Sequence, residues 1–141
     1  MKIDSLKQLT AWNLSWSASE PGPWELNVQG LQQALGSNQL AKGVYWISEP
    51  ARTHATFRAK YCGKAVLQPL IVRLTQHVTG SHNPHIKSRL ASGVKLRFRF
   101  VEFTNPELAE YVEGVMIAAF REEYRWNGRN EWLQHCVLET R

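Results

Sequence analysis

Six side chains with the chemistry needed to hydrolyse a phosphodiester are spread along this chain. They are two tyrosines, an arginine, a histidine, a glutamate and an asparagine: Tyr45, Tyr61, Arg73, His77, Glu113 and Asn127. The planar guanidinium of an arginine donates two hydrogen bonds at once to a phosphate. A carboxylate is a preferred ligand of Mg²⁺. A fold that brings these groups into one pocket can therefore hydrolyse a phosphodiester around one divalent cation.

Each tyrosine lies beside a glycine in a strand-like run. The two runs are Gly43-Val44-Tyr45 and Tyr61-Cys62-Gly63, and Lys64 follows the second. Tyrosines on neighbouring strands are more often half-buried structural residues than members of a site. Glycine is unfavourable inside strands, however, and marks positions where a backbone or a ligand comes close. The glycines therefore favour a functional pair, with both hydroxyls on one surface of a hairpin.

The arginine, the histidine and the glutamate fall on runs with helical spacing. Arg73 and His77 are one helical turn apart and so share one flank of a helix. Glu113 lies in the middle of another helix and is followed by Gly114, which costs about 1 kcal/mol relative to alanine at such a position. Taken singly, each of these residues is more typical of a solvated helix face. Together with the tyrosine runs, their order favours a shared site.

In this order the runs resemble the GIY-YIG nuclease family. Gly43-Val44-Tyr45 stands for its first motif and Tyr61-Cys62-Gly63-Lys64 for its second. Arg73 and His77 match the following helix in the form seen in the family's restriction enzymes. Glu113 matches the single metal-binding glutamate, and Trp126-Asn127 the late Trp-Asn element. The resemblance covers residues 43–127.

The resemblance implies a DNA endonuclease that uses one divalent metal, Mg²⁺ or Mn²⁺, and leaves 5′-phosphate and 3′-hydroxyl ends. Glu113 would hold the metal. Tyr45 would act on the attacking water, directly or as a phenolate whose pKa has been lowered. Arg73 would neutralise the charge that develops on the phosphorus.

The remaining implied roles are supporting ones. Tyr61 would orient the phosphate, His77 would hydrogen-bond Tyr45 or the water, and Asn127 would fix the geometry of the site. The chain departs from the family pattern at Cys62, which replaces the usual aliphatic residue and should point away from the tyrosines. The late element can also be read to Asn130 instead of Asn127.

The sequence pattern predicts an α+β domain with a three-stranded antiparallel sheet flanked by helices. Strands are expected over residues 43–48, 57–63 and 94–103. Strict alternation would place Phe57, Ala59 and Tyr61 on one face of the second strand. It would also give the third strand a basic outer face, formed by Lys95, Arg97 and Arg99.

Helix signals fill the intervals between these strands. Helices are expected over residues 28–35, from Pro69 to Gly80, over 84–92, over 106–121 and over 130–138. Asn83 before a proline is typical of an N-cap, and Thr104-Asn105-Pro106-Glu107 has the form of a capping box.

The 141 residues are expected to form a nuclease-like domain over residues 43–141, with residues 1–42 as an N-terminal extension packing on it. The composition, with 43% hydrophobic and 21% charged residues, is that of a globular protein. The two cysteines, Cys62 and Cys136, are expected to be reduced thiols. No apolar run approaches the roughly 18 residues that span a membrane, and the start lacks a signal-peptide core. We therefore expect a cytoplasmic protein without a membrane partner.

The net charge of +5 and pI of about 9.5 favour a polyanionic partner. The basic residues expected to contact DNA are Lys64, Arg52, Arg58, Lys60, Lys87 and Arg89. They form either a solvated face or a stripe that neutralises phosphates. His82 and His85 lie near His77, but the segment has no cysteine, so we interpret them as turn residues or phosphate contacts and not as a zinc site.

Two other functions are consistent with the same sequence. The first is a nucleic-acid-binding module that keeps this scaffold without turnover. The second is an interaction domain in which the tryptophans form an interface. For a nuclease with one active site per chain, cutting both DNA strands would require a homo-oligomer, a dimer or a tetramer, or sequential visits.

Overall fold

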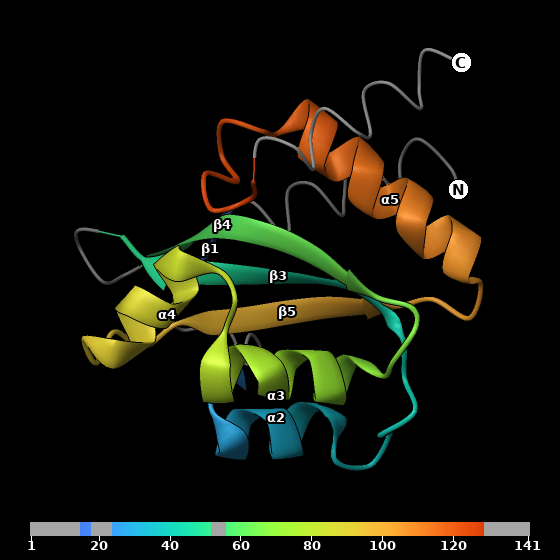
Figure 1. Cartoon of the computed structure of the whole chain (residues 1–141), viewed down its shortest axis with the longest axis horizontal. Helices are drawn as coiled ribbons and strands as arrows, with labels where there is room; N and C mark the ends of the chain where they lie inside the picture. The colour runs from blue at the N-terminus through green and yellow to red at the C-terminus, as the bar shows by residue number, and fades with distance from the viewer. Residues whose placement is uncertain (1–14, 18–23, 52–55, 129–141) are drawn as a thin grey trace.

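The computed structural model describes residues 15–17, 24–51 and 56–128, which form an α+β fold. Its centre is an antiparallel sheet in which strand β3 (Gly43–Pro50) lies between β4 (Thr56–Ala65) and β5 (Arg97–Glu102). These are the three strands that the alternation predicts, with shifted ends. Figure 1 shows the sheet edge-on, with helices on both of its faces.

The described part of the sheet has five strands, so the expectation of three is wrong. The two additional strands are short and lie at the edges, in the order β1-β4-β3-β5-β2. Strand β1 (Ser15–Ser17) pairs with β4, and β2 (Trp24–Glu25) pairs with β5. Both lie within residues 1–42, so these described parts of the predicted N-terminal extension pack on the domain by adding strands to its sheet.

Helices cover the two faces of the sheet separately (Figure 1). Helices α2 (Val28–Leu35), α3 (Leu70–Gly80) and α4 (Pro84–Ala91) are on one side, and α5 (Pro106–Ala119) is on the other. Tyr45 and Ile47 belong to the hydrophobic core under the first group. Trp46 and Cys62 belong to the core under α5, so the cysteine does point away from the tyrosines as expected. None of the helices in the described ranges is long and apolar enough to cross a membrane.

Asparagine side chains cap three of these helices. The side-chain oxygen of Asn83 accepts hydrogen bonds from the backbone N–H groups of His85 (3.0 Å) and Ile86 (3.2 Å), as the sequence predicts. Before α5 the cap is Asn105, which accepts from Glu107 N–H at 2.9 Å. The capping-box form of residues 104–107 therefore predicts the start of α5 correctly. The side chain that caps the helix, however, is Asn105 and not Thr104. The helix and the cysteine expected over 130–138 lie outside the described residues.

Strand β4 carries a bulge that overturns the expected faces of its first half. Ile47 pairs with Tyr61 and Ser48 pairs with Ala59, so Lys60 is an extra residue without a partner in β3. The extra residue reverses the alternation. Phe57 and Ala59 therefore pack under α5, and Tyr61 faces the opposite core together with Tyr45.

The basic outer face expected for β5 is also wrong in part. Helix α5 covers that face of the sheet, and Arg99 is only 2% exposed. Burial lowers the pKa of Arg99 to about 10. The guanidinium of Arg97 lies 4.5 Å from the ring centroid of Phe57. Of the three predicted basic residues, Lys95 alone is exposed.

Candidate active site

The two tyrosines and the histidine predicted for the site lie together on one face of the sheet. Tyr45, on β3, and Tyr61, on β4, have ring centroids 6.1 Å apart. His77, from α3, lies edge-on to both rings, at 5.7 Å from Tyr45 and 5.5 Å from Tyr61. The hydroxyl of Tyr45 is 2.8 Å from Nε2 of His77. Tyr45, Tyr61 and His77 thus form one aromatic cluster, although they are 16 or 32 positions apart along the chain.

The cluster continues through a serine that sequence reasoning missed. Nδ1 of His77 is 2.7 Å from Oγ of Ser81, and the same Oγ accepts a hydrogen bond from the backbone N–H of Asn83 at 3.1 Å. The serine hydroxyl can either accept from an N–H on Nδ1 or donate to a bare Nδ1, so these distances fit both neutral tautomers of His77, one of which carries its proton on Nδ1. In that tautomer Nε2 of His77 accepts the hydrogen bond that the Tyr45 hydroxyl donates. The only sequence signal for Ser81 is its position one turn after His77.

Gly63 makes room for the tyrosine pair. A Cβ at this position would lie 2.5 Å from both Cζ and the hydroxyl oxygen of Tyr45, and 2.9 Å from a ring carbon of Tyr61. Contacts that short do not occur, so any side chain at 63 would have to displace the rings. Gly43 has a different constraint, since its Cβ would lie 2.0 Å from the carbonyl oxygen of Val101. The expectation that both glycines mark close approaches is confirmed.

Arg73, also on α3, interacts with both phenols. Burial lowers the pKa of Arg73, but the interactions with Tyr45 and Tyr61 more than offset this effect and leave the pKa raised. Its Nη1 also donates a hydrogen bond to Gln76 at 3.3 Å. The guanidinium therefore lies beside the hydroxyl ends of the phenols, where it carries a fixed positive charge.

Glu113 reaches the same region from the other face of the sheet. It lies on α5, is 8% exposed, and has an oxygen 3.8 Å from Nζ of Lys64. Lys64 also lies 3.5 Å from the exposed Glu110. Glu113, Lys64, Tyr61 and Arg73 line one pocket of about 560 Å³, which we call the Glu113 pocket. The structure thus brings the single predicted metal ligand and the predicted phosphate-binding arginine to the wall of the same pocket.

A second pocket of about 340 Å³ borders the first. It is lined by Tyr61, Arg73 and His77 together with residues from the α3–α4 connection and from the segment after α5, including His82, His85 and Arg125. We call it the His82 pocket. Tyr61 and Arg73 line both pockets, so these two side chains form the wall between them.

Tyr45 is not a phenolate in this arrangement. The side chain is fully buried, and burial raises the pKa of its hydroxyl well above the usual value. The neighbouring Tyr61 adds to this rise, and Arg73 opposes it without reversing it. The lowered pKa that a standing phenolate would need is therefore absent, and Tyr45 lines neither of the two pockets.

His77 is held in its neutral form. Burial, with smaller contributions from the charges of Arg73 and His82, lowers the pKa of His77 to about 4. A neutral imidazole with Nε2 toward Tyr45 can accept a proton from the phenol. The same lowered pKa makes His77 a weak base, so it can take up a proton from the cluster only transiently.

This depressed pKa predicts a pH-dependent stability. Between pH 6.5 and about 4 the unfolded chain protonates His77 while the folded chain does not. The unfolded state then binds more protons, so stability falls as the pH falls, by at most about 1.4 kcal/mol per pH unit from this group. Urea unfolding across this range should show a shallower pH dependence for His77→Gln than for the parent. The exposed His85→Gln is the control, because His85, unlike His82, does not contribute to the lowered pKa of His77. A parental pH dependence in His77→Gln would contradict the assignment.

Asn127 lies outside the aromatic cluster and holds strand β4. Its Oδ1 accepts from the backbone N–H of Cys62 at 2.9 Å, and its Nδ2 donates to the Cys62 carbonyl at 2.8 Å. The backbone N–H of Trp126 donates to the carbonyl of the bulged Lys60 at 2.9 Å. Residues 126–127 thus pair with the edge of β4 next to Tyr61. This geometry suits the supporting role predicted for Asn127.

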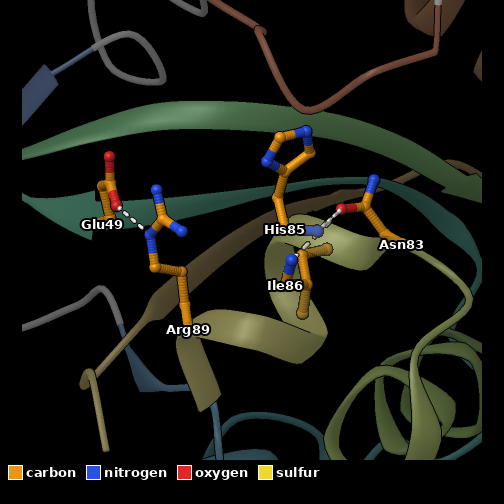
Figure 2. Close-up of polar contacts among 5 residues, drawn as sticks. All are labelled: Glu49, Asn83, His85, Ile86 and Arg89. Carbon is orange, nitrogen blue, oxygen red and sulfur yellow. Dashed lines mark hydrogen bonds and ion pairs between the residues drawn. The ribbon is translucent and has the colours of Figure 1, made fainter. Parts of the chain in front are cut away.

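The residues predicted to contact DNA have diverse surroundings. Arg58 and Lys87 are exposed, and Lys60 is half-buried at the bulge. Arg89 is half-buried and already engaged: its Nε lies 3.1 Å from Oε2 of Glu49 (Figure 2). Its guanidinium lies 5.5 Å from the ring centroid of Trp126. Arg52 lies outside the described residues.

Comparison of the chain with known proteins finds no relative. No protein-family model, no curated protein and no solved structure matches the chain.

Proposed function

We propose that this protein is a divalent-metal-dependent DNA endonuclease that leaves 5′-phosphate and 3′-hydroxyl ends. The observation that supports the proposal best is the convergence on the Glu113 pocket. Tyr61, Arg73 and Glu113 come from a strand and from helices on opposite faces of the sheet, yet they line one pocket. The resemblance to the GIY-YIG nucleases, which rests on the same residues, points to the same chemistry.

The residues present fit a magnesium ion of the kind that nucleic-acid enzymes use. No cluster of three histidine, cysteine or acidic side chains that could cage a metal occurs among the described residues. Mg²⁺ does not require one, because a single carboxylate together with waters and substrate phosphate oxygens completes its six ligands. Glu113 provides that carboxylate at the wall of a pocket wide enough for a phosphate. A bound Mg²⁺ would supply Lewis-acid stabilisation of the charge that develops on the scissile phosphate.

The protein side chains can position the phosphate and remove a proton. Arg73 donates hydrogen bonds to the phosphate oxygens and neutralises part of the charge of the transition state. Lys64 lies next to Glu113 and keeps this carboxylate at the pocket wall.

Proton removal runs along the phenols. A water that attacks the phosphorus gives its proton to the Tyr61 oxygen as Tyr61 gives its own to Tyr45, which it contacts. Tyr45 passes a proton to Nε2 of His77, leaving an imidazolium. The bond to the 3′ oxygen breaks as the new P–O bond forms, and solvent protonates the leaving oxygen. Tyr45 thus acts as a relay behind Tyr61, and no phenolate has to be present beforehand.

Removal of the metal tests the proposal directly. Supercoiled plasmid incubated with the protein and Mg²⁺ should be converted to nicked circles, and EDTA should abolish the conversion. Added Mg²⁺ or Mn²⁺ in excess of the EDTA should restore it. Nicking that persists in excess EDTA would contradict a metal-dependent mechanism.

A non-catalytic nucleic-acid-binding module is the second candidate. It is favoured by the full burial of Tyr45 and by the pairing of Glu113 with Lys64, both of which are compatible with a purely structural site. The same plasmid assay separates the two functions. Retarded migration of the plasmid without nicking, at any metal concentration, would support the module.

A further inference from the structure

The His82 pocket has the composition of an anion site. Arg73 and Arg125 are at its wall, together with His77, His82 and His85. No aspartate or glutamate occurs among the described residues that line it. The described lining therefore carries two fixed positive charges and no carboxylate that would neutralise them, and this favours a bound phosphate group.

One wall of the pocket is held rigidly. The imidazole of His85 stacks on the indole of Trp126, with ring planes 2° apart and centroids 6.0 Å apart. Arg89, one turn further along α4, lies 5.5 Å from the same indole centroid and is anchored by its ion pair with Glu49. Figure 2 shows Arg89 reaching Glu49, while the His85 ring extends from the start of the same helix.

The remaining attachment of this wall comes from Asn83. Its Nδ2 donates a hydrogen bond to the carbonyl oxygen of Trp126 at 2.6 Å, while its Oδ1 caps α4. Helix α4 and the segment after α5 are therefore tied together across the pocket. A wall that is already ordered loses little entropy when a ligand binds.

The position of the His82 pocket relative to the Glu113 pocket indicates which phosphate it could bind. It shares Tyr61 and Arg73 with the Glu113 pocket, so the two pockets lie side by side along one surface. A DNA strand carries a phosphate at every nucleotide, and a strand with one phosphate in the Glu113 pocket extends past this wall.

We infer that the His82 pocket binds a phosphate of the same DNA strand that flanks the scissile one, with Arg125 as its principal contact. Arg125 is exposed, and its Nε donates to the carbonyl oxygen of Glu122 at 3.2 Å, which directs the side chain. His82, also exposed, supplies a second donor. This inference rests on the proposed function for the position of the strand, but it concerns binding and not cleavage.

The test measures affinity in the absence of metal. Anisotropy of a short fluorescent DNA duplex in EDTA should show binding about fivefold weaker for Arg125→Gln than for the parent, with a log–log salt slope reduced by about one. His82→Gln should weaken binding in the same direction. The matched control is Arg121→Gln, which removes an exposed arginine from the same segment outside the pocket and should stay within about twofold of the parent. Thermal melting checks that each variant is folded.

Each outcome decides one claim. If Arg125→Gln and Arg121→Gln bind DNA equally well, the flanking-phosphate site is overturned, whether or not the parent nicks plasmid. If Arg125→Gln binds weakly and the parent never nicks, the binding site stands and the nuclease proposal falls.

The same phosphate chemistry could come from a free anion, and a titration distinguishes the two. Inorganic phosphate alone should shift the ring resonances of His82 and His85 weakly and should compete with the duplex. Saturable phosphate binding that leaves DNA affinity unchanged would assign the pocket to a free phosphate and overturn the inference.

Discussion

Glu113→Gln is expected to reduce plasmid nicking by more than about 100-fold, because the amide removes the one carboxylate charge among the described residues that line the pocket, and with it the affinity for the metal. The change is isosteric, and the neighbouring Lys64 retains an ion pair with Glu110 at 3.5 Å. Folding should therefore be preserved. DNA affinity measured in EDTA should be unchanged or slightly higher, because a negative charge has been removed from a surface that faces phosphate.

Glu110→Gln is the matched control. Both glutamates lie on α5 and both pair with Lys64, but Glu110 is exposed and does not line the pocket. Its activity should stay within about threefold of the parent, since the loss of a surface ion pair is worth at most about 1 kcal/mol. Equal nicking rates for Glu113→Gln and the parent would remove the metal assignment. Equal losses in both variants would place the effect in Lys64 instead.

Gly63→Ala is expected to lower the free energy of unfolding by about 1–3 kcal/mol and to reduce nicking at least about tenfold. The new methyl group would lie 2.5 Å from the Tyr45 ring, which is fully buried between the sheet and α3 and cannot swing into solvent. Relief of the clash must move the hydroxyl that meets His77, and the proton relay is disturbed with it.

Gly80→Ala provides the comparison for this prediction. Gly80 is the last residue of α3, and a Cβ there would meet nothing within 4 Å. Its replacement should leave stability unchanged or raise it by up to about 1 kcal/mol, through the unfolded state. Urea unfolding of the two variants side by side measures the difference. A Gly63→Ala protein as stable as Gly80→Ala would show that the aromatic pair is not tightly constrained.

Alternation and helix signals predict the central part of the fold well. Tyr45 and Ile47 face one core and Val44 and Trp46 the other, as strict alternation requires, because from Gly43 to Ile47 the strand pairs with β4 and with β5 in an unbroken register. The cap Asn83 fixes the start of α4 through short-range hydrogen bonds that the sequence displays directly. The start of α5 is also predicted, although its cap is Asn105 and not the first residue of the capping box.

The missed features depend on partners that are distant in the sequence. The extra residue Lys60 is visible only when β4 is aligned with β3, since either register looks regular within one strand. Strands β1 and β2 have three and two residues, too few to show a period. Burial of Arg99 depends on what packs over β5 in the folded chain, which the composition of β5 does not reveal.

The candidate site likewise has features that the sequence predicts and features that it does not. The types and order of Tyr45, Tyr61, Arg73 and His77 indicate a shared site, and the structure brings all four together. The protonation states could not be predicted, because they depend on burial. An unburied tyrosine beside an arginine would have a lowered pKa, whereas burial reverses the direction for Tyr45.

The pairing of residues 126–127 with the outer edge of β4 restricts how copies of this chain can associate. An open strand edge invites a neighbouring molecule to continue the sheet. Here the N–H and C=O of Cys62 are occupied by the Asn127 amide, and the carbonyl of Lys60 by Trp126. A second copy could add a strand beside Tyr61 only after Trp126 and Asn127 had been displaced from this edge of β4. If two copies assemble to cut both strands of a duplex, as the proposed nuclease would need, their contact is therefore not expected to extend the sheet at this border.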